Sequence, residues 1–88
     1  ALNAGAAALP ATADLVFVGE MGIGNTTPAA ALAAMAFGGG AAAWCGRGTG
    51  LDPAGVARKV AAVDAALTLH APHCTDPFET LRRLGGRE

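Results

Sequence analysis

A glycine-rich segment in the first third of the chain has the composition of an anion-binding loop. It reads Gly-Glu-Met-Gly-Ile-Gly-Asn over residues 19–25, and two threonines and a proline follow it. Glycines let backbone N–H groups approach a ligand closely, and a helix that begins after such a loop adds N–H groups at the positive end of its dipole. A phosphate suits such a loop best. The predicted phosphate-binding residues here are Gly22, Ile23, Gly24, Asn25, Thr26 and Thr27.

The same residues would also fit a tight turn whose role is only structural. The segment lacks the Gly-Lys-Ser/Thr sequence of a P-loop. Thr27 stands where the dinucleotide-binding fingerprint has its third glycine. Taken alone, the residue types of this loop leave the binding and the structural interpretation equally open.

A second glycine-rich segment, residues 46–50, repeats the arrangement before another predicted helix. It adds the candidate phosphate-binding residues Gly46, Arg47, Gly48, Thr49 and Gly50. Arg47 stands between two glycines, where its guanidinium is hard to bury and could reach a phosphate or a carboxylate. Lys59 lies in the second turn of the helix that follows. Before any comparison with a family, a solvated surface lysine is the simpler interpretation of Lys59.

Two other groups of residues could carry chemistry. Glu20 is the one acid near the first loop. At the end of a buried strand it would be either a structural hydrogen-bond acceptor or an active-site group with a tuned proton affinity, and the sequence does not decide which. Zinc ligands could be imagined in Cys45, His70, His73 and Cys74, but their spacing matches no standard pattern. We expect reduced thiols and loop histidines there, and no metal.

The residues around both loops predict helices alternating with strands. The alanine-rich residues 2–9 are typical of a helix that ends at Pro10. The apolar, β-branched run 14–19 predicts a buried parallel strand, and the short apolar run 41–45 predicts a second one. Further helices are expected over residues 28–37, from residue 53 onward and over 77–84.

Capping residues mark where the later helices should begin. Thr26 or Thr27 could cap the helix after the first loop, and Asp52 followed by Pro53 is a typical helix start. An acidic capping box begins at Asp76. On the helix after Pro53, the apolar face is predicted to consist of Val56, Val60, Val63 and Leu67. The polar residues expected away from that face are Arg58, Lys59 and Asp64.

This order of elements predicts an α/β fold with a parallel sheet, a Rossmann-like three-layer arrangement of which residues 1–88 form a single partial domain. Loops that follow neighbouring parallel strands open at the same carboxyl edge of the sheet, where ligands bind in such folds. A chain of 88 residues has a marginal core of its own. The predicted fold would therefore bring both glycine-rich loops to one cleft.

Composition argues against several classes of partner. Six basic and seven acidic residues are scattered, giving a net charge of −1, so no positive stripe for nucleic acid is present. Residues 21–46 carry no charge and are long enough to span a bilayer. They are mostly Ala and Gly and are interrupted by three consecutive glycines, so we expect a helix inside a larger protein and no membrane. Two cysteines suggest reduced thiols and a cytoplasmic location.

Three motifs together resemble the nicotinate-nucleotide:dimethylbenzimidazole phosphoribosyltransferase family. They are Gly-Glu-Met-Gly-Ile-Gly-Asn-Thr-Thr at 19–27, Gly-Arg-Gly-Thr-Gly-Leu-Asp at 46–52 with Ala-Gly-Val-Ala-Arg-Lys at 54–59, and Asp-Pro-Phe-Glu-Thr-Leu-Arg-Arg-Leu-Gly-Gly at 76–86. They occur in the family's order and at family-like spacing. The combination is far more specific than either glycine-rich loop alone.

The resemblance implies an enzyme, usually a homodimer, that acts late in cobalamin synthesis on small-molecule substrates. The family moves phosphoribosyl from nicotinate mononucleotide to 5,6-dimethylbenzimidazole, which gives α-ribazole 5'-phosphate and nicotinate, with no metal or organic cofactor. Carried onto this sequence, both glycine-rich loops would hold the ribose phosphate and Lys59 would help to bind it. Glu20 would lie near the reacting bases as a secondary acid or base.

The resemblance also implies an incomplete site. The family's principal general base is a glutamate in a later glycine-rich motif, beyond Glu88, so the isolated chain is expected to be an inactive fragment. The alternative function is a non-catalytic phosphate- or nucleotide-binding α/β module. A membrane-associated alanine-rich segment is a third and weaker hypothesis.

Overall fold

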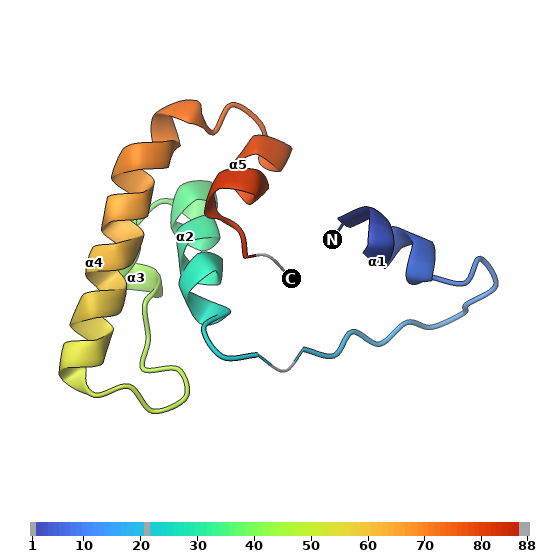
Figure 1. The fold of residues 1–88 in the computed structure, drawn as a ribbon, viewed down its shortest axis with the longest axis horizontal. Helices are drawn as coiled ribbons and strands as arrows, with labels where there is room; N and C mark the ends of the chain where they lie inside the picture. Colours follow the sequence, from blue (N-terminus) through green and yellow to red (C-terminus); the bar gives the residue numbers. More distant parts are fainter. Residues whose placement is uncertain (1, 21, 87–88) are drawn as a thin grey trace.

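The computed structural model describes residues 2–20 and 22–86, and within them the secondary structure is helical. Met21, in the first glycine-rich loop, lies outside the described residues. In chain order the elements are α1 (Leu2–Ala8), α2 (Thr26–Phe37), α3 (Gly40–Trp44), α4 (Pro53–His70), the 3₁₀ turn η1 (Ala71–His73) and α5 (Pro77–Leu84). Helices α2 to α5 pack against one another, while α1 stands apart at the end of a long extended segment (Figure 1).

The core lies where α2, α3, α4 and α5 meet. Its buried members are Ala30, Ala31, Ala41, Val63 and Leu84. Most of these side chains are single methyl groups, so the helices are brought together by small contacts rather than by large interlocking side chains. Around them lie the half-buried Leu32, Met35, Cys45, Val60, Ala66, Leu67 and Cys74. The predicted apolar face of α4 is confirmed at Val60, Val63 and Leu67.

Two of the predicted helix starts are confirmed by their caps. Asp52 Oδ1 accepts a hydrogen bond of 2.7 Å from the N–H of Gly55, with Pro53 at the first position of α4. Asp76 accepts from the N–H groups of both Phe78 and Glu79 at 2.9 Å, which satisfies two donors that α5 would otherwise leave unpaired.

The start of α2 differs from the prediction. Asn25, not Thr26 or Thr27, occupies the N-cap position, and its side chain makes no capping hydrogen bond. The helix therefore begins two residues before Pro28, and both threonines lie in its first turn.

The predicted α/β class is wrong for this chain, since residues 2–20 and 22–86 contain no strand. Residues 41–45 were expected to form a strand, but 41–44 belong to helix α3, whose first residue, Gly40, is the last of three consecutive glycines with positive φ. Alanine has the highest helix propensity, and three alanines in a row favour a helix once Gly38, Gly39 and Gly40 have reversed the chain. Without strands the Rossmann-like three-layer arrangement is absent from the described residues.

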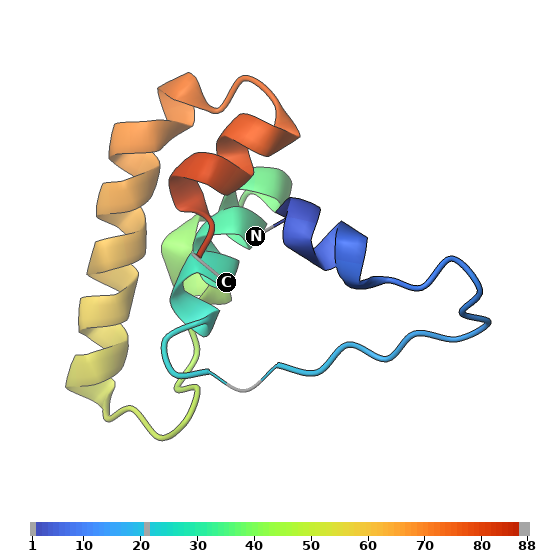
Figure 2. The ribbon, with the colours of Figure 1, turned by 45° about the vertical axis from the view of Figure 1, so that its right-hand side comes forward.

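The first predicted strand is extended but unpaired. Residues 15–20 have no regular secondary structure, and their side chains are exposed, from Val16 at 50 % to Val18 at 97 %. An extended backbone becomes a strand only when a neighbouring strand takes up its N–H and C=O groups, and these residues have no such neighbour. Figure 2 shows the segment running along one side of the molecule, away from the packed helices.

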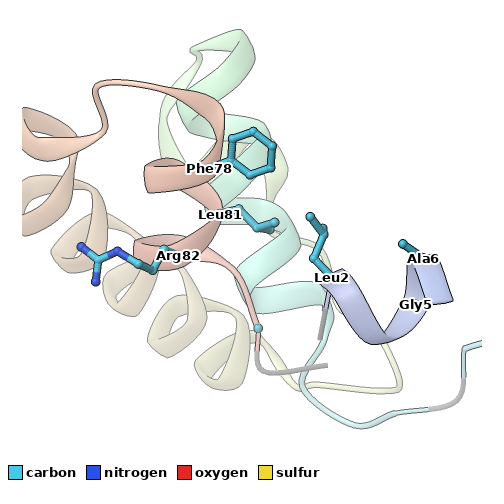
Figure 3. A pocket seen from close by; sticks show the side chains of 7 residues that line it. Leu2, Gly5, Ala6, Phe78, Leu81 and Arg82 are labelled. Atoms are coloured by element: carbon cyan, nitrogen blue, oxygen red, sulfur yellow. The ribbon is translucent and has the colours of Figure 1, made fainter.

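An open hollow of about 630 Å³ lies between α1 and α5 (Figure 3). Leu2 from α1 and Phe78 and Leu81 from α5 line it with apolar side chains, and Arg82 lies at its edge. Since Phe78 is 71 % exposed and Leu2 60 % exposed, α1 does not close over α5. The N-terminal arm, which we define as residues 2–24, is therefore separate from the helical body, residues 25–86.

Candidate phosphate-binding site

Lys59 is the buried charged residue of the helical body, with 7 % of its surface exposed. Its Nζ donates a hydrogen bond of 2.7 Å to Thr26 Oγ1, which joins the second turn of α4 to the first residue of α2. The interpretation of Lys59 as a solvated surface lysine is therefore wrong. Residue 59 follows Val56 by three positions and precedes Val63 by four, so it shares their face of the helix instead of lying away from it.

The second glycine-rich loop reaches the same threonine. A Cβ atom placed on Gly48 would lie 3.6 Å from Thr26 Oγ1. Gly24 belongs to the first loop, and its carbonyl accepts a hydrogen bond of 3.1 Å from the N–H of Thr27. Both loops therefore meet at the start of α2, with the ammonium group of Lys59 between α2 and α4. We call Thr26, Gly48 and Lys59 the ammonium cluster.

The ammonium cluster has a cation but no anion. Salt bridges in the described part of the chain are confined to Glu79 with Arg82 and Arg83, on α5. Thr26 takes one of the three hydrogens on Nζ, which leaves two for another acceptor. Burying a charge without a counter-ion costs free energy, because the ammonium loses its hydration. An anion bound beside Thr26 would offset that cost.

Helix α2 itself supplies few donors for such an anion. The N–H of Thr27 is used by the Gly24 carbonyl, and that of Ala29 by the Asn25 carbonyl at 3.1 Å. Pro28 has no N–H. The helix terminus therefore contributes less than the glycine pattern indicated, and the charge comes mainly from Lys59.

The second loop contributes backbone donors instead. Its turn is closed by hydrogen bonds to the Arg47 carbonyl from the N–H groups of Gly50, at 3.3 Å, and Leu51, at 2.9 Å. Among the hydrogen bonds of the described residues, none uses the N–H of Gly48 or Thr49. Positive φ angles of 53° at Gly48 and 102° at Gly50 favour glycine at both positions. Gly46, like the rest of this loop, is exposed.

Arg47 does not face the ammonium cluster. Its Nε donates a hydrogen bond of 3.2 Å to the carbonyl of Leu51 in its own loop, and the residue is exposed. The guanidinium keeps further N–H groups for a ligand. The predicted role of Arg47 in phosphate binding stays a prediction.

Glu20 is held by the first loop. Asn25 Nδ2 donates a hydrogen bond to Glu20 Oε1, so the acid is tied to the residue that precedes α2. Ile23 is 96 % exposed and contacts neither the ammonium cluster nor the core. Its predicted part in phosphate binding can come only from its backbone.

The cysteine and histidine residues lie at two places along the body: Cys45 follows α3, and His70, His73 and Cys74 lie at or next to η1. Both cysteines are half-buried free thiols, and Cys74 Sγ donates to the His70 carbonyl at 3.3 Å. Over residues 2–20 and 22–86 there is no group of three or more His, Cys, Asp or Glu residues that could hold a metal ion. In the same residues, every helix is too short or too polar to cross a membrane.

Comparisons with known proteins show the family of the chain. A family model described as phosphoribosyltransferase matches residues 1–88. Relatives named nicotinate-nucleotide–dimethylbenzimidazole phosphoribosyltransferase include those of Novosphingobium aromaticivorans, 59 % identical, and Mesorhizobium japonicum, 57 % identical. Each match covers 100 % of this chain and 26 % of the relative, so the chain spans about a quarter of their length. No solved structure matches it. The chain belongs to the phosphoribosyltransferase family.

Proposed function

We propose that residues 1–88 supply the phosphate-holding part of an enzyme that transfers phosphoribosyl from nicotinate mononucleotide to 5,6-dimethylbenzimidazole. The products are α-ribazole 5'-phosphate and nicotinate, used in cobalamin synthesis. The names of the relatives support the reaction, and the uncompensated ammonium of Lys59 supports the place of the phosphate. Of these, the burial of Lys59 beside Thr26 and Gly48 carries the proposal.

The ammonium cluster suits a phosphate monoester. A phosphate monoester is close to a dianion at neutral pH, and Lys59 would give it a charge-assisted hydrogen bond. Thr26 accepts from Lys59, so its own O–H hydrogen is free to donate to a phosphate oxygen. The N–H groups of Gly48 and Thr49 add two donors from the opposite loop. The phosphate would thus be held by groups from both glycine-rich segments.

Holding the phosphate contributes to catalysis at a distance. The phosphate of the nucleotide is remote from the bond between the ribose and nicotinate. Binding energy from such a remote group fixes the anomeric carbon in line with the attacking nitrogen, which converts a bimolecular step into one between positioned groups. Within this chain, Glu20 lies six residues before Thr26 and is held by Asn25, the neighbour of Thr26, and we assign it a secondary acid or base role.

The remaining properties are expectations for the whole protein. We expect it to be a cytoplasmic homodimer whose ligands are small molecules. Its general base is expected outside residues 1–88, so the 88-residue chain should bind the nucleotide without turning it over.

Two measurements test the proposal. The full-length protein that contains this sequence should form α-ribazole 5'-phosphate from the two substrates, detected by mass spectrometry. Calorimetry should then show that it prefers nicotinate mononucleotide to inorganic phosphate and to adenosine monophosphate. Equal affinity for all three ligands, together with no product, would mean a phosphate-binding module and would contradict the enzyme assignment.

A further inference from the structure

Asn25 uses its side chain in an unusual way for a helix N-cap. An Asn at this position normally accepts a hydrogen bond from an N–H in the first turn. Here the side chain of Asn25 makes no capping bond, and its amide donates instead to Glu20 Oε1. The helix start is thus left without a side-chain cap, and the carboxylate gains a fixed partner.

Gly22 shows how closely the two side chains fill the loop. A Cβ atom on Gly22 would lie 2.7 Å from Glu20 Oε1 and 2.8 Å from Asn25 Nδ2. The side chains of Glu20 and Asn25 therefore leave no room for a Cβ atom at residue 22. At Gly19, three residues earlier, an added Cβ would meet no atom within 4 Å. Gly22 therefore leaves space specifically for the pair Glu20 and Asn25.

The same short stretch also positions the cation. Asn25 is followed directly by Thr26, whose hydroxyl accepts from Lys59. Two consecutive residues at the start of α2 thereby hold a carboxylate and an ammonium group. Because Asn25 engages Oε1, the second carboxylate oxygen, Oε2, keeps its lone pairs for another partner.

We propose that Asn25 is a positioning residue that fixes the Glu20 carboxylate relative to the ammonium cluster. With the phosphate held by Lys59 and Thr26, the free oxygen Oε2 faces the heteroaromatic base of the bound substrate. This inference rests on the proposed function. It adds that the distance between the phosphate and the acid is set by α2, through Asn25 and Thr26.

A double-mutant cycle in the full-length enzyme tests the assignment. The variants are Asn25→Ala, Glu20→Gln and the two combined, with kcat and the KM for nicotinate mononucleotide measured for each. Asn25→Ala should lower kcat roughly tenfold, the loss expected when a hydrogen bond to a carboxylate is removed, and should change KM less than about twofold. If Asn25 acts through Glu20, the double variant will be no slower than Glu20→Gln alone.

Two glycine substitutions provide a matched control. Gly22→Ala puts a methyl group where the pair lies and should reduce kcat as Asn25→Ala does. Gly5→Ala, in the separate helix α1, adds the same methyl group where no atom lies within 4 Å and should leave kcat unchanged. Additive losses of kcat in the double variant would overturn the positioning role. A change of KM larger than the change of kcat would also overturn it, because a purely structural role of Asn25 would disturb Thr26 and thereby phosphate binding.

The outcomes separate this inference from the proposed function. A full-length wild-type protein that forms no product overturns the function, and with it the role of Asn25 in catalysis. An active wild type with additive variants overturns only the role of Asn25. An independent readout is the side-chain amide signal of Asn25 by ¹⁵N NMR, which should shift in Glu20→Gln and stay unchanged in Asp14→Asn; no shift in Glu20→Gln would show that the pair does not form.

Discussion

The N-terminal arm is at least as apolar in sequence as the helical body, yet the two differ completely in packing. All described side chains of the arm are exposed, including the run Leu15, Val16, Phe17 and Val18. In the body, side chains as small as alanine are buried, and Val63 is 1 % exposed. An apolar residue is buried only where the same chain supplies a partner surface. In the body, four helices supply such surfaces to one another, whereas nothing packs against the side chains of the arm.

The candidate site lies at the boundary between the N-terminal arm and the helical body. The first glycine-rich loop ends the arm, and α2 begins the body. Glu20 belongs to the arm but is held by Asn25 of the body, while Lys59 is fully part of the body. We therefore expect substitutions in the body to change the stability, the phosphate binding or both. Substitutions in the arm should change stability little.

The largest effect is expected when the same valine substitution is made in both regions. Val63→Ala removes two methyl groups from the most buried large side chain and leaves a cavity, so it should lower the free energy of unfolding by about 2–3 kcal/mol. Val18→Ala removes the same atoms from a side chain that is 97 % exposed, and it should change the free energy of unfolding by less than about 0.5 kcal/mol. Urea titration of the 88-residue chain followed by circular dichroism measures both, and equal losses would show that the arm packs against the body.

The second effect concerns neighbouring cations on α4. Lys59→Ala should weaken the binding of nicotinate mononucleotide to the full-length protein by ~1–3 kcal/mol, because the phosphate loses a charge-assisted hydrogen bond. Arg58→Ala, which removes an exposed cation, is the matched control and should change binding little. Calorimetry at one fixed salt concentration compares them. Equal weakening by both variants would indicate a general effect of charge and remove Lys59 from the site.

Removing the charge of Lys59 should weaken phosphate binding without lowering the stability of the fold. Lys59→Met keeps the length of the side chain and removes a buried charge without a counter-ion. The variant should unfold with the same free energy as the wild type or with about 1 kcal/mol more, while it binds the phosphate less well. A clear loss of stability in Lys59→Met would mean that the hydrogen bond to Thr26 is needed for folding.

A fourth prediction uses the helix caps of the body. Asp52→Ala removes the acceptor for the Gly55 N–H at the start of α4 and should lower the free energy of unfolding by about 1 kcal/mol. Asp64→Ala, in the exposed middle of the same helix, removes a carboxylate that makes no hydrogen bond among the described residues, and alanine favours the helix. In thermal unfolding, the melting temperature of Asp64→Ala should be higher than that of Asp52→Ala. The reverse order would contradict the capping assignment.

The starts of α4 and α5 and the apolar face of α4 were predicted well from the sequence. Asp52 with Pro53, Asp76 with Pro77 and the valine spacing on α4 each depend on neighbours within a few residues, and the structure confirms them. The two strands were predicted wrongly for different reasons. At residues 14–19 a strand needs a partner strand, which no local pattern can supply. At residues 41–45 the alanine content favoured a helix that the short apolar run did not indicate.

The candidate site could be predicted in its residue types but not in its contacts. The bond between Lys59 and Thr26 joins residues 33 positions apart, and no spacing rule connects them. The burial of Lys59 could have been found, because its distance from Val56 and Val63 places it on the apolar face. The pairing of Glu20 with Asn25 and the space left by Gly22 arise from side-chain packing, for which the glycine pattern gave no signal.

The smallest predicted effect concerns the ion pairs on α5. Hydrogen bonds from Arg82, and then from Arg83, lower the pKa of Glu79 from 4.5 to about 2. Both Arg82 contacts are 2.8 Å long and the Arg83 contact is 2.9 Å. A pKa that is lower in the folded state stabilises the fold above the unfolded value, and this contribution is lost as the pH falls from about 4.5 to about 2.

Glu79→Gln should therefore be slightly less stable than the wild type at pH 7, and the difference should shrink between pH 4.5 and pH 2. Added salt should also reduce this difference in stability, because the ion pairs are partly exposed and are screened by ions. Asp14→Asn makes the same change from acid to amide in the arm, where the carboxylate has no hydrogen bond among the described residues, and should leave the stability at pH 7 unchanged. A pH-independent difference for Glu79→Gln would show that the amide disturbs the packing of α5, and that the ion pairs do not stabilise the body.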